Sequence, residues 1–258
     1  MNRISKKMIF ITGATSGIGR ATAMAYAKMG ANLILTGRNI DVLKEMKSKL
    51  HEWYDIKVHI LKFDVRNLEE IKDAVNNLPE EFKKIDILIN NAGLALGVDK
   101  IHESSFESFD TIMDTNVKGL LYVSRVVIPY MLEHSPDGHI VNIASTAAQA
   151  AYAGGGVYCA SKAAVKTLSD GMRIDLIDTP VRVTTINPGM VETNFSITRF
   201  GGDKKRADKV YEGIEPLMAE NVADTIIYAT NLPLNVQICD LTVTSNHQAD
   251  GRTSYRQK

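Results

Sequence analysis

The sequence predicts an α/β fold, in which a doubly wound and mostly parallel sheet carries helices on both faces. Short apolar runs rich in β-branched residues alternate with longer segments of helical period along the whole chain. Runs that are apolar throughout are typical of strands buried on both faces, and strand–helix alternation is typical of right-handed βαβ units. Because 258 residues are enough to bury one large core, we expect a single domain over residues 1–258.

The predicted elements follow one another in a regular order. Six apolar runs bounded by Gly, Asn or Pro predict strands at 8–12, 32–36, 57–63, 85–90, 139–145 and 181–187. Segments of helical period predict helices at 17–29, 39–51, 67–77, 105–133 and 157–178. A seventh strand is expected at 237–244, after a helix near 220–231.

One region breaks this order. Residues 190–216 follow Pro188-Gly189 and contain glycines, charges and scattered apolar residues without a clean period. Long irregular inserts at the carboxyl ends of parallel strands often form substrate lids. We therefore expect a substrate-loop insert here, and an ordinary solvated loop is the alternative.

The composition excludes several classes of protein. Thirty basic residues balance thirty acidic ones, so no global charge draws the chain toward nucleic acid or an anionic membrane. Cys159 and Cys239 are too few for a disulfide framework and have no metal-ligand spacing, which favours reduced thiols in a cytoplasmic protein. No apolar run approaches the length of a signal-peptide core or a membrane span. The six histidines form neither HxH nor HExxH, so no metal is expected.

A glycine-rich turn follows the first strand. The segment TGATSGIGRA has glycines at positions 13, 17 and 19. A strand, a glycine turn and a helix start bring backbone N–H groups and the helix dipole to one point, which suits a pyrophosphate. The spacing GxxxGxG differs from the GxGxxG fingerprint, and a glycine turn alone also simply joins a strand to a helix. Its place directly after the first strand favours dinucleotide binding.

The end of the second strand distinguishes two dinucleotides. NAD-binding units usually carry an acidic residue here, whereas this chain has Gly37 followed by Arg38. A carboxylate would repel a 2′-phosphate, and a guanidinium binds phosphate through charge-assisted hydrogen bonds. The sequence therefore predicts NADP(H) rather than NAD(H). An exposed arginine that merely opens a helix would leave the missing acid unexplained.

Three polar residues meet at the end of the fifth strand. Ser145 closes that strand, and Tyr158 and Lys162 lie four residues apart, on one face of the next helix. Taken singly, these residues are most often a cap, half-buried packing and a solvated lysine. Together they place a hydroxyl, a phenol and an ammonium at the carboxyl end of a parallel strand, where such sheets bind ligands.

Carbonyl reduction by a nicotinamide gives these three groups a purpose, because it needs a hydride on carbon and a proton on oxygen. A tyrosine supplies the proton, but its ordinary pKa near 10 makes it a poor acid–base group at neutral pH. An ammonium about 4 Å away favours the phenolate by roughly 4 kcal/mol at an effective dielectric near 20, or about 3 pKa units. We therefore expect Lys162 to lower the pKa of Tyr158, and Ser145 to bind the substrate oxygen.

Five ordered motifs complete the pattern: TGATSGIG, NNAG at 90–93, the strand-end Ser145, YCASK at 158–162 and NPG at 187–189. Along essentially the whole chain this set resembles the short-chain dehydrogenase/reductase family. The resemblance implies a Rossmann-type seven-stranded sheet and a homotetramer, with a dimer as the alternative. It also implies that Asn116 holds a water that relays protons to Lys162.

The resemblance extends to the cofactor contacts. Asp64 and Val65 would flank the adenine, Asn91 and Gly93 the nearby ribose, and the segment from 188 to 193 the nicotinamide. The full set expected to bind NADP(H) is Gly13, Thr15, Ser16, Gly17, Ile18, Gly19, Arg38, Asn39, Asp64, Val65, Asn91, Ala92, Gly93, Tyr158, Lys162, Pro188, Gly189, Val191 and Thr193.

Longer stretches narrow the resemblance within the family. NNAGLALG, DTNVKGLLY, YAGGGVYCASKA and RFGGD are similar to the NADP-dependent 3-hydroxy acid dehydrogenases, which include bacterial serine/allo-threonine dehydrogenases. This implies oxidation of the C3 hydroxyl of a short 3-hydroxy acid, although MVETNF after the Pro-Gly pair is closer to the general family form.

A short hydroxy acid also needs its carboxylate bound. Arg199 in the insert is the expected partner, with a plain surface arginine as the equal alternative. Two other functions stay open: a reductase of other small carbonyl compounds, such as a sugar, sterol or xenobiotic, and a protein that senses NADP(H) without turnover.

Overall fold

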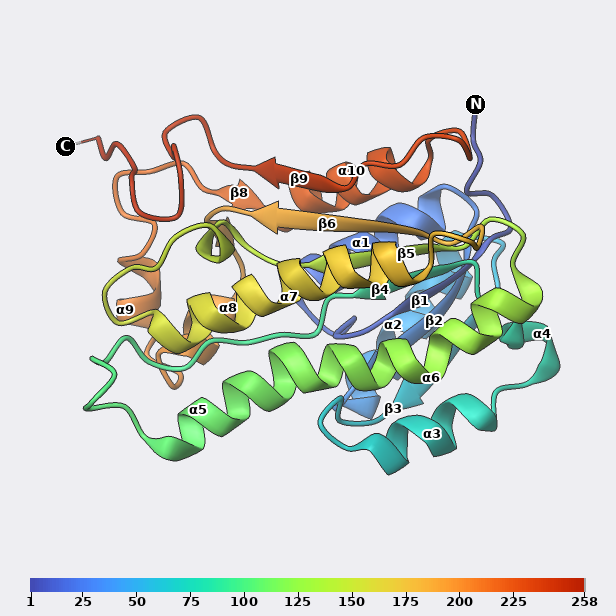
Figure 1. Ribbon diagram of the computed structural model, residues 1–258, viewed down its shortest axis with the longest axis horizontal. Helices are drawn as coiled ribbons and strands as arrows, with labels where there is room; N and C mark the ends of the chain where they lie inside the picture. The colour runs from blue at the N-terminus through green and yellow to red at the C-terminus, as the bar shows by residue number, and fades with distance from the viewer. Residues whose placement is uncertain (258) are drawn as a thin grey trace.

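The computed structural model describes residues 1–257 and contains a seven-stranded parallel sheet (Figure 1). All six neighbouring pairs in this sheet are parallel. In sheet order the strands are β3 (Val58–Lys62), β2 (Asn32–Gly37), β1 (Met8–Ile11), β4 (Ile87–Asn90), β5 (His139–Ile143), β6 (Arg182–Pro188) and β9 (Asp240–Val243). The chain winds outward from β1 to one edge and then from β4 to the other. The predicted doubly wound α/β fold is confirmed.

Helices cover both faces of the sheet. On one face lie α1 (Gly17–Lys28), α2 (Ile40–Trp53) and α10 (Ala219–Thr230). On the other lie α3 (Leu68–Asn76), α4 (Glu80–Lys83), α6 (Gly119–His134) and α7 (Gly156–Asp175). Figure 1 shows α6 and α7 side by side in front of the strands.

The apolar strands supply both layers of the core. In β1, Ile9 and Ile11 pack into the cluster under α1, α2 and α10, whereas Met8 and Phe10 pack into the cluster under α3, α6 and α7. Successive side chains of a strand point to opposite faces, so a strand covered on both sides is apolar throughout. For this reason the strands are continuous apolar runs in the sequence.

The segment expected as one helix at 105–133 is divided into three parts. Helix α5 (Phe106–Met113) passes into a π-helical turn, η1 (Asp114–Lys118), and then into α6. Directly after the turn, a Cβ on Gly119 would lie 2.7 Å from Cγ2 of Val65, so the backbone approaches the loop after β3 closely. Tertiary contacts of this kind decide the turn, and the helical period of the sequence does not show them.

The segment expected to be irregular at 190–216 contains regular elements. Its ends are joined by a short parallel pair, β7 (Val191–Glu192) with β8 (Leu217–Met218). Between them lie α8 (Asn194–Arg199) and α9 (Lys204–Asp208), capped by the side chains of Thr193 and Asp203. The expectation of an irregular segment was wrong for these stretches, because helices of five or six residues are too short to display a period.

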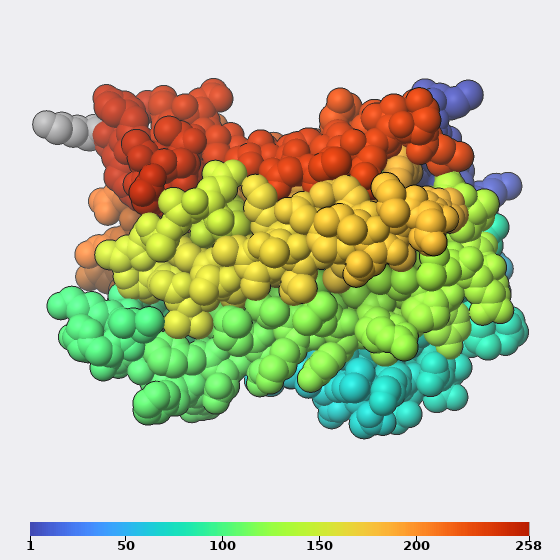
Figure 2. All heavy atoms as spheres, in the orientation of Figure 1, coloured from blue at the N-terminus to red at the C-terminus, as the bar shows by residue number. Residues whose placement is uncertain are grey.

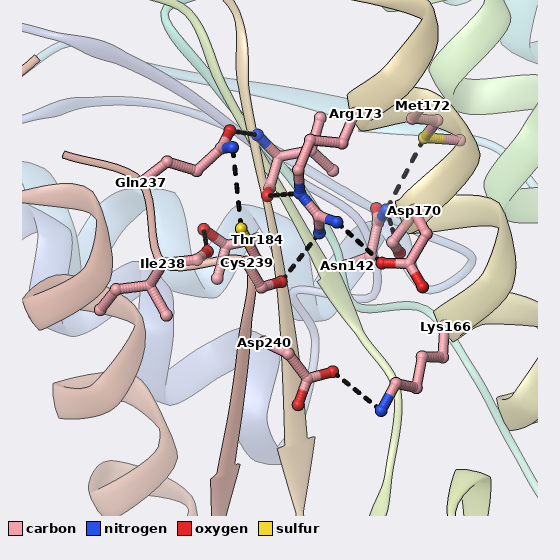
Figure 3. Close-up of polar contacts among 12 residues, drawn as sticks. Asn142, Lys166, Asp170, Met172, Arg173, Thr184, Gln237, Ile238, Cys239 and Asp240 are labelled. Atoms are coloured by element: carbon pink, nitrogen blue, oxygen red, sulfur yellow. Dashed lines mark hydrogen bonds and ion pairs between the residues drawn. The ribbon is translucent and has the colours of Figure 1, made fainter. Parts of the chain in front are cut away.

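Helix α7 is tied to the edge of the sheet (Figure 3). The Arg173 guanidinium donates from Nε to the Val183 carbonyl at 3.2 Å and from Nη2 to the Cys239 carbonyl at 2.9 Å. Lys166 lies 3.4 Å from the carboxylate of Asp240. These contacts fix α7 against β6 and β9, and α7 is the helix that carries Tyr158 and Lys162.

Candidate active site

A cavity of about 280 Å³ opens at the carboxyl ends of the central strands. One end of it is formed by the glycine-rich turn and Arg38, and the other by Ser145, Tyr158 and Lys162. The two sites that the sequence predicts separately are therefore parts of one continuous space.

The glycine-rich turn forms the floor of this cavity. Gly13 and Gly17 have φ angles of 65° and 50°, in the left-handed region that favours glycine. A Cβ on Gly19 would lie 2.3 Å from the Gly13 carbonyl oxygen, so only glycine lets α1 start this close to the strand. Gly19 itself does not line the cavity. No side chain caps the start of α1, and its first N–H groups therefore remain available to an anion.

The opposite wall of this end contains an exposed arginine. Arg38 lines the cavity together with Asp64 and Val65. A hydrogen bond from the Arg66 side chain lowers the pKa of Asp64, which stays ionised at neutral pH. Asn39, expected among the cofactor contacts, does not line the cavity; its side chain accepts from the N–H groups at positions 41 and 42 and so caps α2.

The three chemical residues converge at the other end. The Ser145 hydroxyl accepts a hydrogen bond from the N–H of Ala147 at 3.1 Å, at the start of the 3₁₀ turn η2 (Thr146–Ala148). Lys162 is 5% exposed, and its ammonium donates to the Ile143 carbonyl at 2.8 Å. The same ammonium lies 6.0 Å from the ring centroid of Tyr158.

The pKa values in this cluster differ from the sequence expectation. Burial raises the pKa of Tyr158 well above its ordinary value, and the Ser145 hydroxyl only partly offsets this. Burial also lowers the pKa of Lys162 to about 8. The expected lowering of the Tyr158 pKa by Lys162 is therefore wrong for the chain alone. The ammonium is bound to a main-chain carbonyl instead of the phenol, and both groups have lost their hydration.

Asn116 lies beside Lys162, outside the lining of the first cavity. Its Oδ1 accepts from the Leu94 N–H at 2.8 Å, and its Nδ2 donates to the Leu94 carbonyl at 2.8 Å and to the Ser161 hydroxyl at 3.0 Å. A Cβ on Gly93 would lie 3.2 Å from Asn116 Oδ1 and 3.3 Å from Lys162 Nζ. Asn116 and Lys162 thus face the same small space.

Arg199 reaches the site from helix α8. Its Nε donates to the Gly97 carbonyl at 3.0 Å and its Nη1 to the Tyr152 hydroxyl at 3.1 Å. The guanidinium lies 6.0 Å from the Tyr158 ring centroid. It borders a second cavity of about 370 Å³, which shares Tyr158 with the first. Over residues 1–257, no carboxylate lies within ion-pair distance of this guanidinium.

Most residues expected to bind the cofactor line the first cavity. They are Gly13, Thr15, Ser16, Gly17, Ile18, Arg38, Asp64, Val65, Asn91, Ala92, Gly93, Tyr158, Lys162, Pro188, Gly189, Val191 and Thr193. The sequence reasoning missed Tyr152 and Phe195, whose ring centroid lies 5.6 Å from that of Tyr158. Both residues lie in stretches that resemble the family, YAGGGVYCASKA and MVETNF, but no pattern there marks either as a site residue, and only the folded insert brings Phe195 to the site.

In the part of the chain that the structure describes, no helix is both long and apolar enough to cross a membrane. In the same residues, no group of three or more His, Cys, Asp or Glu side chains is placed to hold a metal ion.

Comparison with known proteins agrees with this geometry. The short chain dehydrogenase family model matches residues 7–202. The NADP-dependent 3-hydroxy acid dehydrogenase of Schizosaccharomyces pombe is 41% identical over 259 residues, which is 100% of each chain. Sulfoacetaldehyde reductase 2 of Chromohalobacter salexigens is 41% identical over 242 residues, covering 94% of this chain and 95% of its own.

A solved structure gives the same result in three dimensions. The closed form of a serine dehydrogenase complexed with NADP⁺ is 40% identical, covers 97% of this chain and 100% of its own, and superposes with a TM-score of 0.89. The order of the motifs, the sheet topology and the matched family model all agree. The chain belongs to the short-chain dehydrogenase family.

Proposed function

We propose that the protein is an NADP-dependent oxidoreductase that transfers a hydride between NADP(H) and the C3 hydroxyl or carbonyl of a short 3-hydroxy acid. The observation that carries the proposal is the single cavity with Arg38 at one end and Ser145, Tyr158 and Lys162 at the other. Relatives named as a 3-hydroxy acid dehydrogenase and a serine dehydrogenase support the substrate class.

The residues present fit NADP(H). The glycine turn and the uncapped start of α1 would hold the pyrophosphate, and Arg38 would hold the 2′-phosphate. Gly37 leaves no acid to repel that phosphate, and its own Cβ would lie 2.8 Å from Thr15. When bound, the oxidised cofactor supplies the hydride acceptor and a positive charge.

Residues of the chain itself would accept and transfer the proton of the substrate hydroxyl. In the oxidising direction Tyr158 takes the proton of the substrate hydroxyl, while Ser145 donates a hydrogen bond to the substrate oxygen. Lys162, whose pKa is about 8, would pass the proton onward, and the phenolate would be favoured by the positive charge of the bound cofactor. Asn116, across the small space from Lys162, would fix the water through which that proton leaves.

Arg199 is proposed to bind the acid group of the substrate. Its guanidinium has no carboxylate partner in the described chain and points past Tyr158, with Tyr152 and Gly97 fixing two of its donors. In 3-hydroxypropionate and in sulfoacetaldehyde alike, one carbon separates the reacting carbon from the acid group. A carboxylate and a sulfonate would therefore both suit a guanidinium at this place. The insert at 190–216 would close over the substrate, because Arg199 lies within it.

A substrate panel tests the function. NADPH formation is measured with serine, allo-threonine and 3-hydroxypropionate, and NADPH consumption with sulfoacetaldehyde and neutral ketones, each with the NAD counterpart in parallel. We expect turnover of the acids with NADP(H). Turnover of neutral carbonyls alone would favour a general reductase. Tight NADPH binding without any turnover would favour a sensor, which the Ser145–Tyr158–Lys162 arrangement argues against.

We further propose a homotetramer, because two separate surfaces expose apolar side chains. On the α6–α7 face (Figure 2), Leu132 is 44% and Ile174 71% exposed. On α10, which covers the other face of the sheet, and in the segment that follows it, Tyr228 and Leu234 are each 59% exposed. Two unlike interfaces on one chain allow a closed tetramer, and light scattering measures its mass.

We propose a cytoplasmic location because of the state of the two cysteines. Cys159 and Cys239 are both free, which suits a reducing compartment. Fractionation of the source cells, followed by detection of the protein in each fraction, tests this.

A further inference from the structure

Helix α7 carries two buried serines that are built alike. Ser161 donates to the Tyr158 carbonyl at 2.7 Å and accepts from the Asn116 amide at 3.0 Å. Ser169 donates to the Val165 carbonyl at 2.7 Å and accepts from the amide of Asn142 at 2.9 Å. Both serines are 0% exposed. Each serine therefore links α7 to an asparagine of another element through a pair of hydrogen bonds. The two links differ in the residues that they connect.

The link through Ser169 lies in the core. Asn142 lies on β5 and accepts in turn from the amide of Asn90 on β4, at 2.8 Å. It also points toward Met172 of α7 (Figure 3). This chain of amides joins two strands to the helix, away from the cavity.

The link through Ser161 ends at the main-chain carbonyl of Tyr158. Helix α7 begins after Gly155 with Gly156, and no side chain caps its first turn. A glycine start without a cap leaves the backbone of such a turn more freedom than other residues would. Tyr158 lies on this turn, so the Ser161 hydroxyl on its carbonyl restrains the segment from which the phenol projects.

At its other end, the link through Ser161 contacts Asn116 in the π-helical turn η1. A π-helical turn shifts the backbone hydrogen bonds by one residue, and such turns are frequent at functional sites. Asn116 lies within η1, and its amide grips both peptide groups of Leu94 as well as Ser161. Both of its N–H donors are therefore engaged in holding the turn opposite Lys162, and only Oδ1, which accepts one hydrogen bond, keeps acceptor capacity for the relay water.

We propose that Ser161 is a positioning residue for proton transfer, fixing the η1 turn in register with Tyr158 and Lys162. This role rests on the proposed function. The proton taken up by Tyr158 leaves past Lys162 toward Asn116, and Ser161 neither gains nor loses a proton in the net reaction. Its hydroxyl lies 3.0 Å from the Asn116 amide nitrogen and 2.7 Å from the main-chain carbonyl of Tyr158, so it links the backbone of the tyrosine to the turn that contains Asn116.

Three variants of the full-length protein test this role: Ser161→Ala, Ser161→Cys and the matched control Ser169→Ala. The cysteine keeps the shape of the side chain, with a slightly larger atom, but offers only a weak S–H donor. We expect both Ser161 variants to lower kcat about 10- to 100-fold, the size of effect that a small misplacement produces. Their KM and NADPH affinity should be unchanged, and the solvent deuterium isotope effect on kcat should rise as proton transfer becomes limiting.

The control separates positioning from stability. Ser169→Ala removes the same two hydrogen bonds from the same helix, so its thermal midpoint should fall as far as that of Ser161→Ala while kcat stays at the wild-type value. Equal kcat in the two alanine variants, wild-type kcat in Ser161→Cys or an unchanged isotope effect would overturn the role of Ser161. A wild-type protein that turns over no alcohol or carbonyl would instead overturn the proposed function itself.

Discussion

The two ends of the parallel sheet bury polar residues in opposite ways. At the amino ends of β4, β5 and β6, Asp86, His139 and Arg182 are each less than a tenth exposed and bind other parts of the chain. The Asp86 carboxylate accepts from the N–H of Met8 at 2.8 Å, and Arg182 donates to the carbonyl of Val236 at 2.9 Å. At the carboxyl ends, the buried residues leave hydrogen-bonding capacity directed into a cavity.

This difference separates stability from chemistry. Polar groups at the amino ends bind neighbouring groups of the chain, so their removal should change the free energy of unfolding. Polar groups at the carboxyl ends await a ligand, so their removal should change turnover or binding. Substitutions at each end test that separation.

The largest effect is expected for Tyr158→Phe. Without the phenolic hydroxyl the site has no proton carrier next to the substrate oxygen, and kcat should fall about 10²- to 10⁴-fold. NADPH affinity, measured by fluorescence, should stay at the wild-type value, because the ring is kept. Activity close to wild type in this variant would remove the proposed mechanism.

The next effect concerns the cofactor. Arg38→Leu should raise the KM for NADP⁺ about 10- to 100-fold, since hydrogen bonds to a charged group are lost, and should leave the KM for NAD⁺ unchanged. Arg20→Leu is the matched control, because Arg20 is an exposed arginine on α1 that does not line the cavity. An equal change for both dinucleotides would show that Arg38 does not read the 2′-phosphate.

At the amino end, acid should lower stability through His139. Burial, helped by the charges of Arg182 and Lys7, lowers the pKa of His139 from 6.5 to about 3. The unfolded chain takes up this proton near pH 6.5 while the folded chain stays neutral to about pH 3, so stability falls as pH falls between these values. At pH 5 the loss is about 2 kcal/mol.

Urea unfolding at pH 8 and pH 5 checks this. The variant His139→Gln keeps an N–H donor for Thr184, which His139 contacts at 2.7 Å, but cannot take up a proton. The drop in unfolding free energy between the two pH values should be about 2 kcal/mol smaller in the variant. Identical drops in both proteins would contradict the role of His139, and kcat at pH 8 should be equal.

The smallest effect is expected for the acid clamp. Arg199→Met should raise the KM for acid substrates about tenfold and spare neutral alcohols, because one charge-assisted contact is lost. Arg206→Met is the control in the same insert, where Arg206 stacks on Phe200 at 4.7 Å. If acids and neutral alcohols are affected alike, Arg199 shapes the insert and does not bind the acid group.

The sequence predicted the sheet well because each strand is buried on both faces and therefore apolar throughout. It also placed Ser145, Tyr158 and Lys162 together, since strand ends and helix starts of a parallel sheet share one edge. It failed where three-dimensional contacts decide. The π-helical turn lies next to the close approach of Gly119 to Val65, and nothing in the stretch that begins at Tyr152 indicates that its hydroxyl accepts from Arg199.

The direction of the Tyr158 pKa could not be predicted for a related reason. A free ammonium about 4 Å from the phenol would lower the pKa of Tyr158, because its attraction for the phenolate would dominate at that distance. In the structure the Ile143 carbonyl holds that ammonium, and dehydration of the phenol outweighs its influence. Helical spacing predicts which residues share a face, but not which of several partners a long side chain selects.

The short β7–β8 pair has a consequence for how this chain diversifies. Because Val191–Glu192 and Leu217–Met218 join the two ends of the insert, the residues between them form a flap whose ends are held together. Changes of length or sequence after Thr198 leave the lining of the first cavity in place, because no later residue of the flap belongs to it. Natural or designed sequence changes in this part of the flap can therefore alter substrate selection while Ser145, Tyr158 and Lys162 stay in place.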